Sequence, residues 1–401
     1  MPPFHPLASD HDVPAAEVAL AEAECALALG RLDGLLTGLN SAETVLFSWA
    51  LLRLTLLSGL AGAGFADAEM RFNGWFAGLE RGPAETRRTP FPAHVLVRAV
   101  LAELADHRWA PLAEVARIAR RIGRFAPDGA AADPGGAAAT PGDAVERARA
   151  LVCPDGSPER PSSPALPFPA LASLAGIARH DPLFAPVEQG VAVLPVGRRS
   201  LAVSQAAPAA PLWALDLALG NLLADGGTWT LPLPCPGALR PAALAPHLWP
   251  GERALVLAQG LDDAARRLGA LVATARRRGA LMERGLAHLR SSARAPQVWM
   301  AAVAFAPLGL DQIVTGFGVS RRGTYAVSDA LVGAGLVTRR TERGMVVLAG
   351  RDTVETPTER PSTRGIAPPS PALPAPALAE FDAAMADLDR LLTRYPGAGA
   401  G

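Results

Sequence analysis

Apolar residues recur at three- and four-residue steps along much of the chain, which is the spacing of one face of an α-helix. In the first third, this pattern predicts four helices, over residues 13–29, 42–60, 92–107 and 111–122. Asp12 and Ser41 precede the first two and suit helix N-caps, and Gly30 suits the end of the first. We therefore expect a helical, bundle-like N-terminal domain over residues 13–124.

The residues from 125 to 169 lack this periodicity and are rich in proline, glycine, alanine and serine. Such a composition is typical of linkers and of surface segments without regular structure. The exception is a short helical pattern over residues 143–151. The segment is the clearest predicted domain boundary in the chain.

Helical patterning resumes over residues 170–295, which we expect to form a middle domain. Residues 212–223 are almost all apolar and predict a buried helix, whereas residues 191–203 suit a β-hairpin that turns near Gly197. The domain is predicted to end in a long arginine-rich helix over residues 262–295.

An apolar seam runs along that long helix in alternating four- and three-residue steps, as in a heptad repeat. Its members are Leu261, Ala265, Leu268, Val272, Ala275, Gly279, Met282, Leu286 and Leu289. The seam is flanked by Arg266, Arg267, Arg276, Arg277, Arg278, Arg284 and Arg290. It either packs on the helix's own domain or pairs with a second copy of the chain, giving a homodimer through residues 261–289. The sequence leaves both possibilities open.

The chain after residue 307 has the pattern of a helix-turn-helix. A short helix is predicted over residues 310–317, followed by Gly318, Val319 and Ser320. Glycine reaches the positive φ that a tight turn needs, and serine is a strong N-cap. We expect a second helix over residues 321–334 to follow this turn.

The second helix has an apolar and a polar side at helical spacing. The apolar side consists of Ala326, Val327, Ala330, Leu331 and Ala334, and Gly335 suits the helix end. The polar side consists of Arg321, Arg322, Thr324, Tyr325 and Ser328. In a helix-turn-helix the second helix enters the major groove, so these five side chains and the capping Ser320 are the predicted DNA contacts.

Two short strand-like runs follow, over residues 336–340 and 345–348, with a loop suited to a hairpin between them. A hairpin after a helix-turn-helix predicts a winged helix, which would span residues 296–350 and begin with a helix over residues 296–306. The arginines predicted to lie on or near the wing and to reach DNA phosphates are Arg339, Arg340 and Arg343.

Beyond residue 350 the composition changes again. Residues 351–376 are rich in threonine, proline and serine and are expected to be disordered. Residues 377–395 regain a helical pattern, which predicts an amphipathic helix at the end of this linker.

The chain is neutral overall, and it contains arginine but no lysine. Residues 262–351 nevertheless hold fourteen arginines and six acidic residues. A local excess of positive charge suits a polyanionic partner, because neutralised phosphates release counterions. The plainer interpretation is a set of solvated helix faces.

The C-terminal pattern resembles the winged-helix transcription regulators, in which a Gly-Val-Ser turn and a helix ending in Gly-Leu-Val are common. Val314 stands where those proteins often carry alanine, and Gly316 and Gly323 are poor helix formers. More broadly, residues 210–350 resemble an uncharacterised alphaproteobacterial, often plasmid-borne, helix-turn-helix family. That resemblance rests on residues 213–223, the arginine-rich helix and the turn at Gly318, and it implies DNA binding.

Other functional classes leave little trace in the sequence. Cys25, Cys153 and Cys235 are far apart, and the seven histidines have no metal-ligand spacing, so we expect no metal, no cofactor and reduced thiols. None of the common phosphate-binding, zinc-protease or serine-hydrolase motifs occurs, so we do not expect an enzyme. No signal peptide or clean membrane span is evident, which favours a cytoplasmic protein without a membrane partner.

Together these patterns predict a mainly α-helical, multi-domain protein. Its expected function is binding of double-stranded DNA through a C-terminal winged helix-turn-helix, as a transcriptional regulator. The alternative is a non-enzymatic interaction or scaffold protein whose winged helix contacts another protein.

Overall fold

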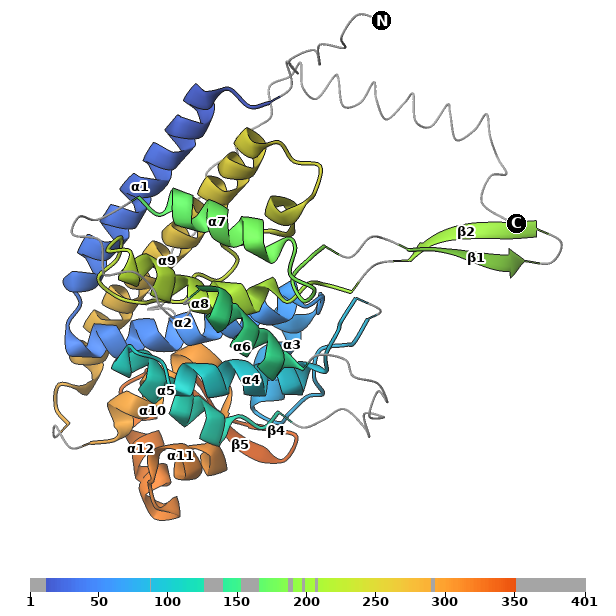
Figure 1. The fold of residues 1–401 in the computed structure, drawn as a ribbon. Helices are drawn as coiled ribbons and strands as arrows, with labels where there is room; N and C mark the ends of the chain where they lie inside the picture. The colour runs from blue at the N-terminus through green and yellow to red at the C-terminus, as the bar shows by residue number, and fades with distance from the viewer. Residues whose placement is uncertain are drawn as a thin grey trace, which may run out of the picture. The chain divides into compact units, whose positions relative to one another are not determined.

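The computed structural model describes residues 12–86, 88–125, 140–152, 166–186, 190–196, 199–205, 208–289 and 293–350. This part of the chain is mainly helical, with twelve α-helices and two small antiparallel sheets (Figure 1). The predicted helical class is therefore confirmed. The predicted linker 351–376, the terminal helix 377–395 and much of the linker 125–169 lie outside the described residues.

The first third forms five helices: α1 (Ala15–Thr37), α2 (Ser41–Gly62), α3 (Ala68–Phe76), α4 (Ala93–Ala105) and α5 (Ala110–Ile122). Asn40, rather than the predicted Ser41, caps α2. Its side chain accepts a hydrogen bond from the backbone N–H of Glu43 (2.9 Å), whose carboxylate accepts one from the backbone N–H of Asn40 (3.0 Å). The first helix also continues past its predicted end at Gly30, because its apolar stripe extends to Leu36, which is buried.

The middle of the chain contains α6 (Pro141–Val152), α7 (Phe168–Ala178), β1 (Gly190–Val196), β2 (Arg199–Gln205), α8 (Leu212–Asp225), a 3₁₀ turn (Pro241–Leu244) and α9 (Pro250–Leu286). Strands β1 and β2 pair as the predicted hairpin, with Val196 opposite Arg199. Helix α6 confirms the short helix predicted over residues 143–151 within the linker segment. It forms because Ala144, Ala148 and Val152 make a buried stripe that packs against α4 and α8.

Helix α9 is the long arginine-rich helix, and it begins at Pro250, well before the predicted start at residue 262. It lies alongside α1 and also packs on α2 (Figure 1). Its heptad seam, from Leu261 to Leu286, is buried in the core that these helices share. Of the two possibilities that the sequence left open, the structure therefore shows packing of the seam within its own chain.

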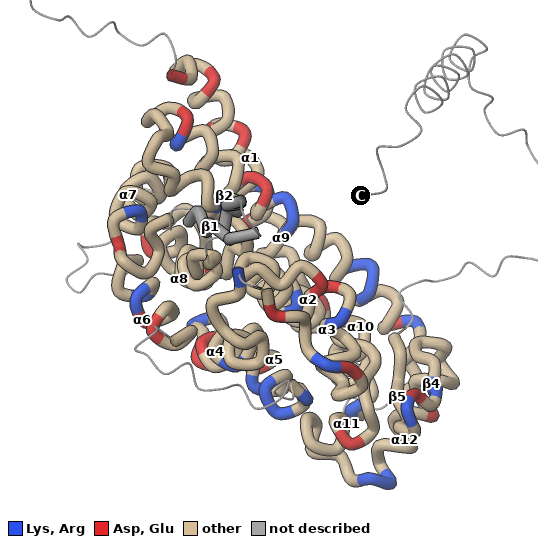
Figure 2. Tube along the Cα trace, turned by 90° about the vertical axis from the view of Figure 1, so that its right-hand side faces the viewer, with Lys and Arg blue, Asp and Glu red and all other residues tan. Residues whose placement is uncertain are grey.

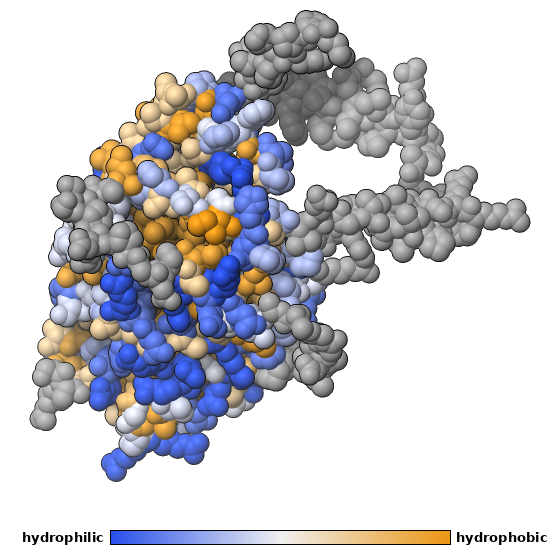
Figure 3. All heavy atoms as spheres, in the orientation of Figure 1, coloured by the Kyte–Doolittle hydropathy of each residue, from blue (hydrophilic) through white to orange (hydrophobic). Residues whose placement is uncertain are grey.

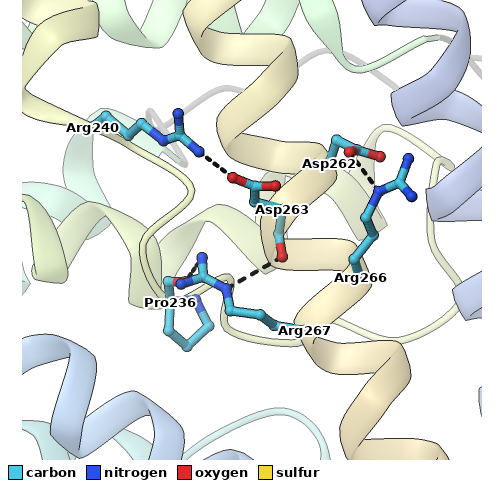
Figure 4. Close-up of polar contacts among 6 residues, drawn as sticks. All are labelled: Pro236, Arg240, Asp262, Asp263, Arg266 and Arg267. Atoms are coloured by element: carbon cyan, nitrogen blue, oxygen red, sulfur yellow. Dashed lines mark hydrogen bonds and ion pairs between the residues drawn. The ribbon is translucent and has the colours of Figure 1, made fainter. Parts of the chain in front are cut away.

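The arginines of α9 mostly serve the fold. Arg267 Nη2 donates to the carbonyl oxygen of Pro236 (2.9 Å), and Arg266 pairs with Asp262 (2.6 Å), as Figure 4 shows. Arg276 Nη2 donates to the carbonyl oxygen of Leu35 (3.1 Å) at the end of α1. Arg267 and Arg276 thus join α9 to a loop and to α1, whereas the Arg266 pair is formed within α9 itself.

The segment after α8 is fixed by a buried carboxylate on that helix. Asp216 accepts hydrogen bonds from the backbone N–H groups of Gly237 (2.6 Å) and Leu239 (2.9 Å). Burial raises the pKa of Asp216 to about 7, against the opposing effect of these N–H donors and of nearby Arg267. Asp216 therefore anchors residues 237–239 to the helical body.

The last elements are α10 (Ala295–Phe305), β3 (Leu308–Gly309), α11 (Leu310–Phe317), α12 (Arg321–Gly333), β4 (Val337–Glu342) and β5 (Met345–Gly350). The three strands form an antiparallel sheet in the order β3-β5-β4. Both the short helix and the hairpin lie where the sequence predicted them, and β3 is an addition. This strand of two residues is too short to give a periodic signal.

One continuous hydrophobic core extends from Cys25 in α1 to Leu348 in β5. The amide of Gln312 in α11 joins distant segments, because its Nε2 donates to the carbonyl oxygens of Phe76 (3.0 Å) and Ile122 (2.8 Å). The described residues from 12 to 350 belong to one compact unit. The boundaries predicted near residues 170 and 296 therefore fall inside a shared core rather than between separate domains.

Among the described helices, α2 is the one with the length and hydropathy of a membrane-spanning helix. It packs against α5, α9 and α10, and 56% of its most apolar window is buried inside the protein. Trp49 and Phe47 on this helix are fully or almost fully buried. Its apolar composition matches its place at the centre of the core.

Candidate nucleic-acid interface

The turn between α11 and α12 has the geometry that its sequence predicted. Gly318 adopts a left-handed conformation, with φ 63° and ψ 31°. Ser320 then caps α12, since its Oγ accepts a hydrogen bond from the backbone N–H of Gly323 (3.1 Å). The turn therefore directs the first residues of α12 away from α11 and fixes where the second helix begins.

Close packing explains why Gly316 and Gly323, which are poor helix formers, occur in these two helices. A Cβ at Gly316 would overlap Cγ2 of Ile122 in α5, and one at Gly323 would lie 2.8 Å from Cγ1 of Val319. Val319 is the apolar residue of the turn and packs against the core. The absence of these two side chains lets α11 approach α5 and lets the turn fold tightly over α12.

Helix α12 ends in a Schellman motif centred on Gly335. The backbone N–H of Leu336 donates to the carbonyl oxygen of Leu331 (3.0 Å), and that of Gly335 donates to the carbonyl oxygen of Val332 (2.9 Å). Gly335 has a φ of 70°. This confirms the predicted glycine stop and turns the chain directly into β4.

The inward face of α12 differs from the predicted one. Thr324, Ser328 and Leu331 are fully buried, whereas Ala326 is exposed. The Thr324 hydroxyl donates to the carbonyl oxygen of Ser320 (3.1 Å), and Ser328 Oγ has no hydrogen-bond partner among the described residues. The helix packs on α10, α11 and β4 through this stripe, so Thr324 and Ser328 face the core and not the outward side on which they were predicted.

The outward face of α12 begins with Arg321 and Arg322 and continues to Tyr325. The Arg321 side chain is 82% exposed and lies 3.4 Å from Asp311, so its ion pair is weak and open to water. Tyr325 is 48% exposed. Arg322 is also exposed and makes no ion pair with any residue that the structure describes. These three side chains project from the first turns of the helix.

The three arginines predicted for the wing point in different directions. Arg339 pairs with Asp329 of α12, so it joins the hairpin to the helix. Neighbouring side chains of a strand point to opposite faces, and Arg340 instead pairs with Glu342 (3.4 Å) and lines a groove beside α2 and α9. Arg340 is thus on the hairpin, as predicted, but its side chain points to the opposite face of β4 from Arg339.

Arg343 lies at the tip of the hairpin. Glu342 pairs with Met345, so Arg343 and Gly344 form a two-residue turn, with φ values of 49° and 80°. Arg343 is exposed and has no ion pair with any described residue. Arg339 and Arg340 both pair with described carboxylates, so Arg343 differs from them in being both exposed and without such a pair.

Two further arginines, which the sequence pattern did not single out, come close to the turn. Arg121 of α5 and Arg294 before α10 line a groove of about 890 Å³ that ends at Gly318. Figure 2 shows basic residues on α5 and at the start of α12 toward the same end of the described fold, and hydrophilic residues dominate this end in Figure 3. About 200 residues separate Arg121 from the turn, so no sequence spacing could have revealed this.

Two features of the described residues concern metal and thiol chemistry. No group of three or more histidine, cysteine, aspartate or glutamate side chains there is placed to hold a metal ion. Cys25 and Cys235 are buried, and burial raises the pKa of both thiols, that of Cys25 to about 12.

Neither a protein-family model nor a curated protein sequence matches the chain. A function can therefore be inferred only from the geometry of the α12 face and of the grooves.

Proposed function

We propose that residues 295–350 are a winged helix-turn-helix through which the protein binds double-stranded DNA as a transcriptional regulator. This proposal is supported by the order of the elements, which is helix, short strand, helix, turn, helix and hairpin. It is also supported by the sheet order β3-β5-β4, in which the short strand between the first two helices pairs with the last strand of the hairpin. In such a unit α12 is the recognition helix and the β4–β5 hairpin is the wing.

The observation that carries the proposal is the exposed start of α12. Arg321, Arg322 and Tyr325 project outward from a helix whose N-terminus is capped by Ser320. Arginine can bind guanine edges and phosphates through several parallel hydrogen bonds, and the first turns of a recognition helix are the part that meets base edges. A positive helix N-terminus adds to the attraction for phosphate.

Only some of the arginines predicted for the wing belong to the proposed DNA contact. Arg343, at the tip of the hairpin, is placed to meet a phosphate of the DNA backbone. Arg339 orients the hairpin through Asp329, and it can exchange this carboxylate for a phosphate when DNA arrives. Arg340 is not part of the proposed contact surface, nor are the buried Thr324 and Ser328.

The experiment is fluorescence anisotropy with labelled random-sequence duplex DNA over a series of salt concentrations. The wild-type chain is compared with an Arg321→Ala/Arg322→Ala variant. If each arginine contacts one phosphate, the slope of log K against log salt becomes less steep by about 2, and affinity at low salt falls roughly tenfold or more.

A charge-matched control separates specific contacts from net charge. Arg31 on α1 and Arg98 on α4 are exposed, and replacing both with alanine removes the same charge elsewhere. This control variant should keep the wild-type slope and affinity. Wild-type protein that does not bind duplex DNA even at low salt, or equal losses in both variants, would argue against the proposal.

A second candidate is a protein-contact surface on the same face. Tyr325 and Val332 are large hydrophobic side chains exposed by 48% and 38% on α12. Exposed aromatic and aliphatic groups near arginine are typical of protein interfaces. If DNA binding fails, a Tyr325→Ala change that abolishes a salt-insensitive protein interaction would favour this alternative.

A further inference from the structure

A second groove lies behind the hairpin, on the opposite side of β4 from α12. It has a volume of about 810 Å³ and is bounded by α2, α9, α10 and the end of β5. That volume is within the range of small-molecule sites in proteins, which are roughly 300–1,000 Å³. All of its walls belong to the same compact unit.

The floor of this groove is aliphatic. Leu54 and Leu57 come from α2, Leu271 from α9 and Val303 from α10, and all four pack on the core while remaining partly exposed. Three helices thus leave a shared apolar surface that no described side chain covers fully. A ligand with an apolar body would remove this surface from water, which favours its binding in proportion to the area buried.

The rim is mainly cationic. The charged residues that line the groove are Arg53, Arg267, Arg278, Arg340 and Glu69. Arg340 also pairs with Glu342 (3.4 Å), so four guanidinium groups stand against two carboxylates at the edge of the apolar floor, and this excess of positive charge gives the groove a positive potential. Because its walls are of low dielectric, that potential is focused on whatever occupies it.

Arg267 is held in place by carbonyl groups. Its Nε donates to the carbonyl oxygen of Asp263 (3.2 Å) and its Nη2 to that of Pro236 (2.9 Å), as Figure 4 shows. These neutral acceptors orient the guanidinium, which also lies near the buried carboxyl group of Asp216. A fixed cation costs less side-chain entropy to engage than a mobile one, which favours binding of an anion.

One buried polar atom at the groove also lacks a partner. Oδ1 of Asn73 on α3 is inaccessible to solvent and accepts no hydrogen bond from any described residue, and Asn73 lines the groove. Buried acceptors are nearly always satisfied in folded proteins. A water molecule at this end of the groove would supply the missing donor.

We propose that this groove binds a small amphipathic organic anion, an aliphatic body ending in a carboxylate. The body lies on Leu54, Leu57, Leu271 and Val303, and the carboxylate meets the arginine rim near Arg340. This groove is a different surface from the DNA contact of α12, and its occupancy by such an anion does not depend on DNA binding.

The test is isothermal titration of the full chain with decanoate, kept below its micelle concentration, and with decyltrimethylammonium, which has the same chain and the opposite charge. Decanoate should bind saturably and at least tenfold more tightly than the cation. Arg340→Glu reverses a charge on an exposed side chain and should weaken decanoate binding at least tenfold, whereas Arg340→Lys should stay within about threefold of wild type.

Arg121→Glu is the matched control, because it reverses one exposed charge in the groove near Gly318. It should leave decanoate binding unchanged, with folding of all variants checked by circular dichroism. Equal binding of the anion and the cation would overturn the proposal. So would loss of binding in Arg121→Glu with retention in Arg340→Glu, which would place the ligand in the other groove.

Discussion

At the scale of single residues, a few buried polar groups determine how loops and helices meet. Asp216 is the clearest case, since a carboxylate that is only 5% exposed accepts two backbone N–H groups from the segment that follows its helix. Burial disfavours the charged form and raises its pKa to about 7. The side chain therefore titrates near neutral pH, which an exposed aspartate does not do.

This pKa predicts a pH-dependent stability. Between about pH 4 and pH 7 the folded state binds a proton at Asp216 that the unfolded state does not bind, so the free energy of unfolding falls as pH rises. The total loss is on the order of a few kcal/mol, at about 1.4 kcal/mol for each pKa unit. Stability from this group is complete below about pH 4 and lost once the pH passes about 7.

Urea unfolding of wild type and Asp216→Asn across the range from about pH 4 to pH 8 measures the effect. Asparagine keeps one acceptor oxygen and cannot ionise, so the variant should be less stable at low pH by a constant amount and should lack the decline toward pH 7. Parallel pH profiles for the two proteins would show that Asp216 keeps an ordinary pKa.

At the scale of elements, glycines set how closely helices approach other segments. A Cβ at Gly220 in α8 would overlap the backbone of Leu233, and one at Gly260 in α9 would overlap the carbonyl oxygen of Ala238. The segment between these helices therefore presses directly on both of them. A Cβ at Gly269, further along α9, would meet nothing within 4 Å, so this glycine carries no such constraint.

Gly220→Ala and Gly269→Ala should consequently have opposite effects. Backbone cannot move aside as a flexible side chain can, so Gly220→Ala should destabilise the protein by roughly 3 kcal/mol or more. Gly269→Ala should stabilise it by about 0.5 to 1 kcal/mol, through helix propensity alone. Chemical denaturation gives both values, and a Gly220→Ala variant as stable as wild type would rule out the close approach.

At the scale of the whole molecule, the C-terminal helix-turn-helix region is joined to the N-terminal helices by a shared core and one buried amide. Gln312 donates to carbonyl oxygens from α3 and α5, and its Oε1 accepts from the backbone N–H of Gly309 (2.8 Å). Replacing it with leucine removes the side-chain donor to the Ile122 carbonyl and the acceptor of the part-buried Gly309 N–H, at about 1–3 kcal/mol each, whereas the Phe76 carbonyl still accepts from the backbone N–H of Arg124 (2.9 Å). Residues 308–350 should then unfold locally, without unfolding of the N-terminal helices.

Hydrogen–deuterium exchange tests this coupling. In wild type, residues of α11 and α2 should lose protection together, whereas in Gln312→Leu residues 308–350 should exchange first. Gln297→Leu, an identical change at an exposed position on α10, should behave as wild type. Separate exchange of the two regions in wild type would indicate that the shared core does not unite them.

Local signals explain which features could be predicted from the sequence. The turn at Gly318, the cap at Ser320, the stop at Gly335 and the hairpin around Gly344 are all confirmed, because each depends on backbone conformations that a few adjacent residues impose. The apolar seam of α9 is confirmed as a buried stripe for a similar reason. Periodicity alone decides which residues share one face of a helix.

The spacing of residues does not show which element packs on a given helix face, because this depends on contacts with parts of the chain that are distant in sequence. Small polar side chains such as Thr324 and Ser328 are compatible with water or with a close helix contact, so only the packing of α10 and α11 placed them inside. The same holds for the α9 seam, whose pattern suits a second copy of the chain as well as it suits α1.

The sequence by itself therefore determined the helical class, the turns and caps of residues 310–350 and the basic, polar start of α12, because these follow from short-range sterics and spacing. The tertiary structure alone decided that α1 covers the α9 seam, that Arg340 faces away from α12, and that four arginines surround an apolar groove. Those outcomes depend on contacts between residues far apart in the chain, and such contacts leave no local pattern in the sequence.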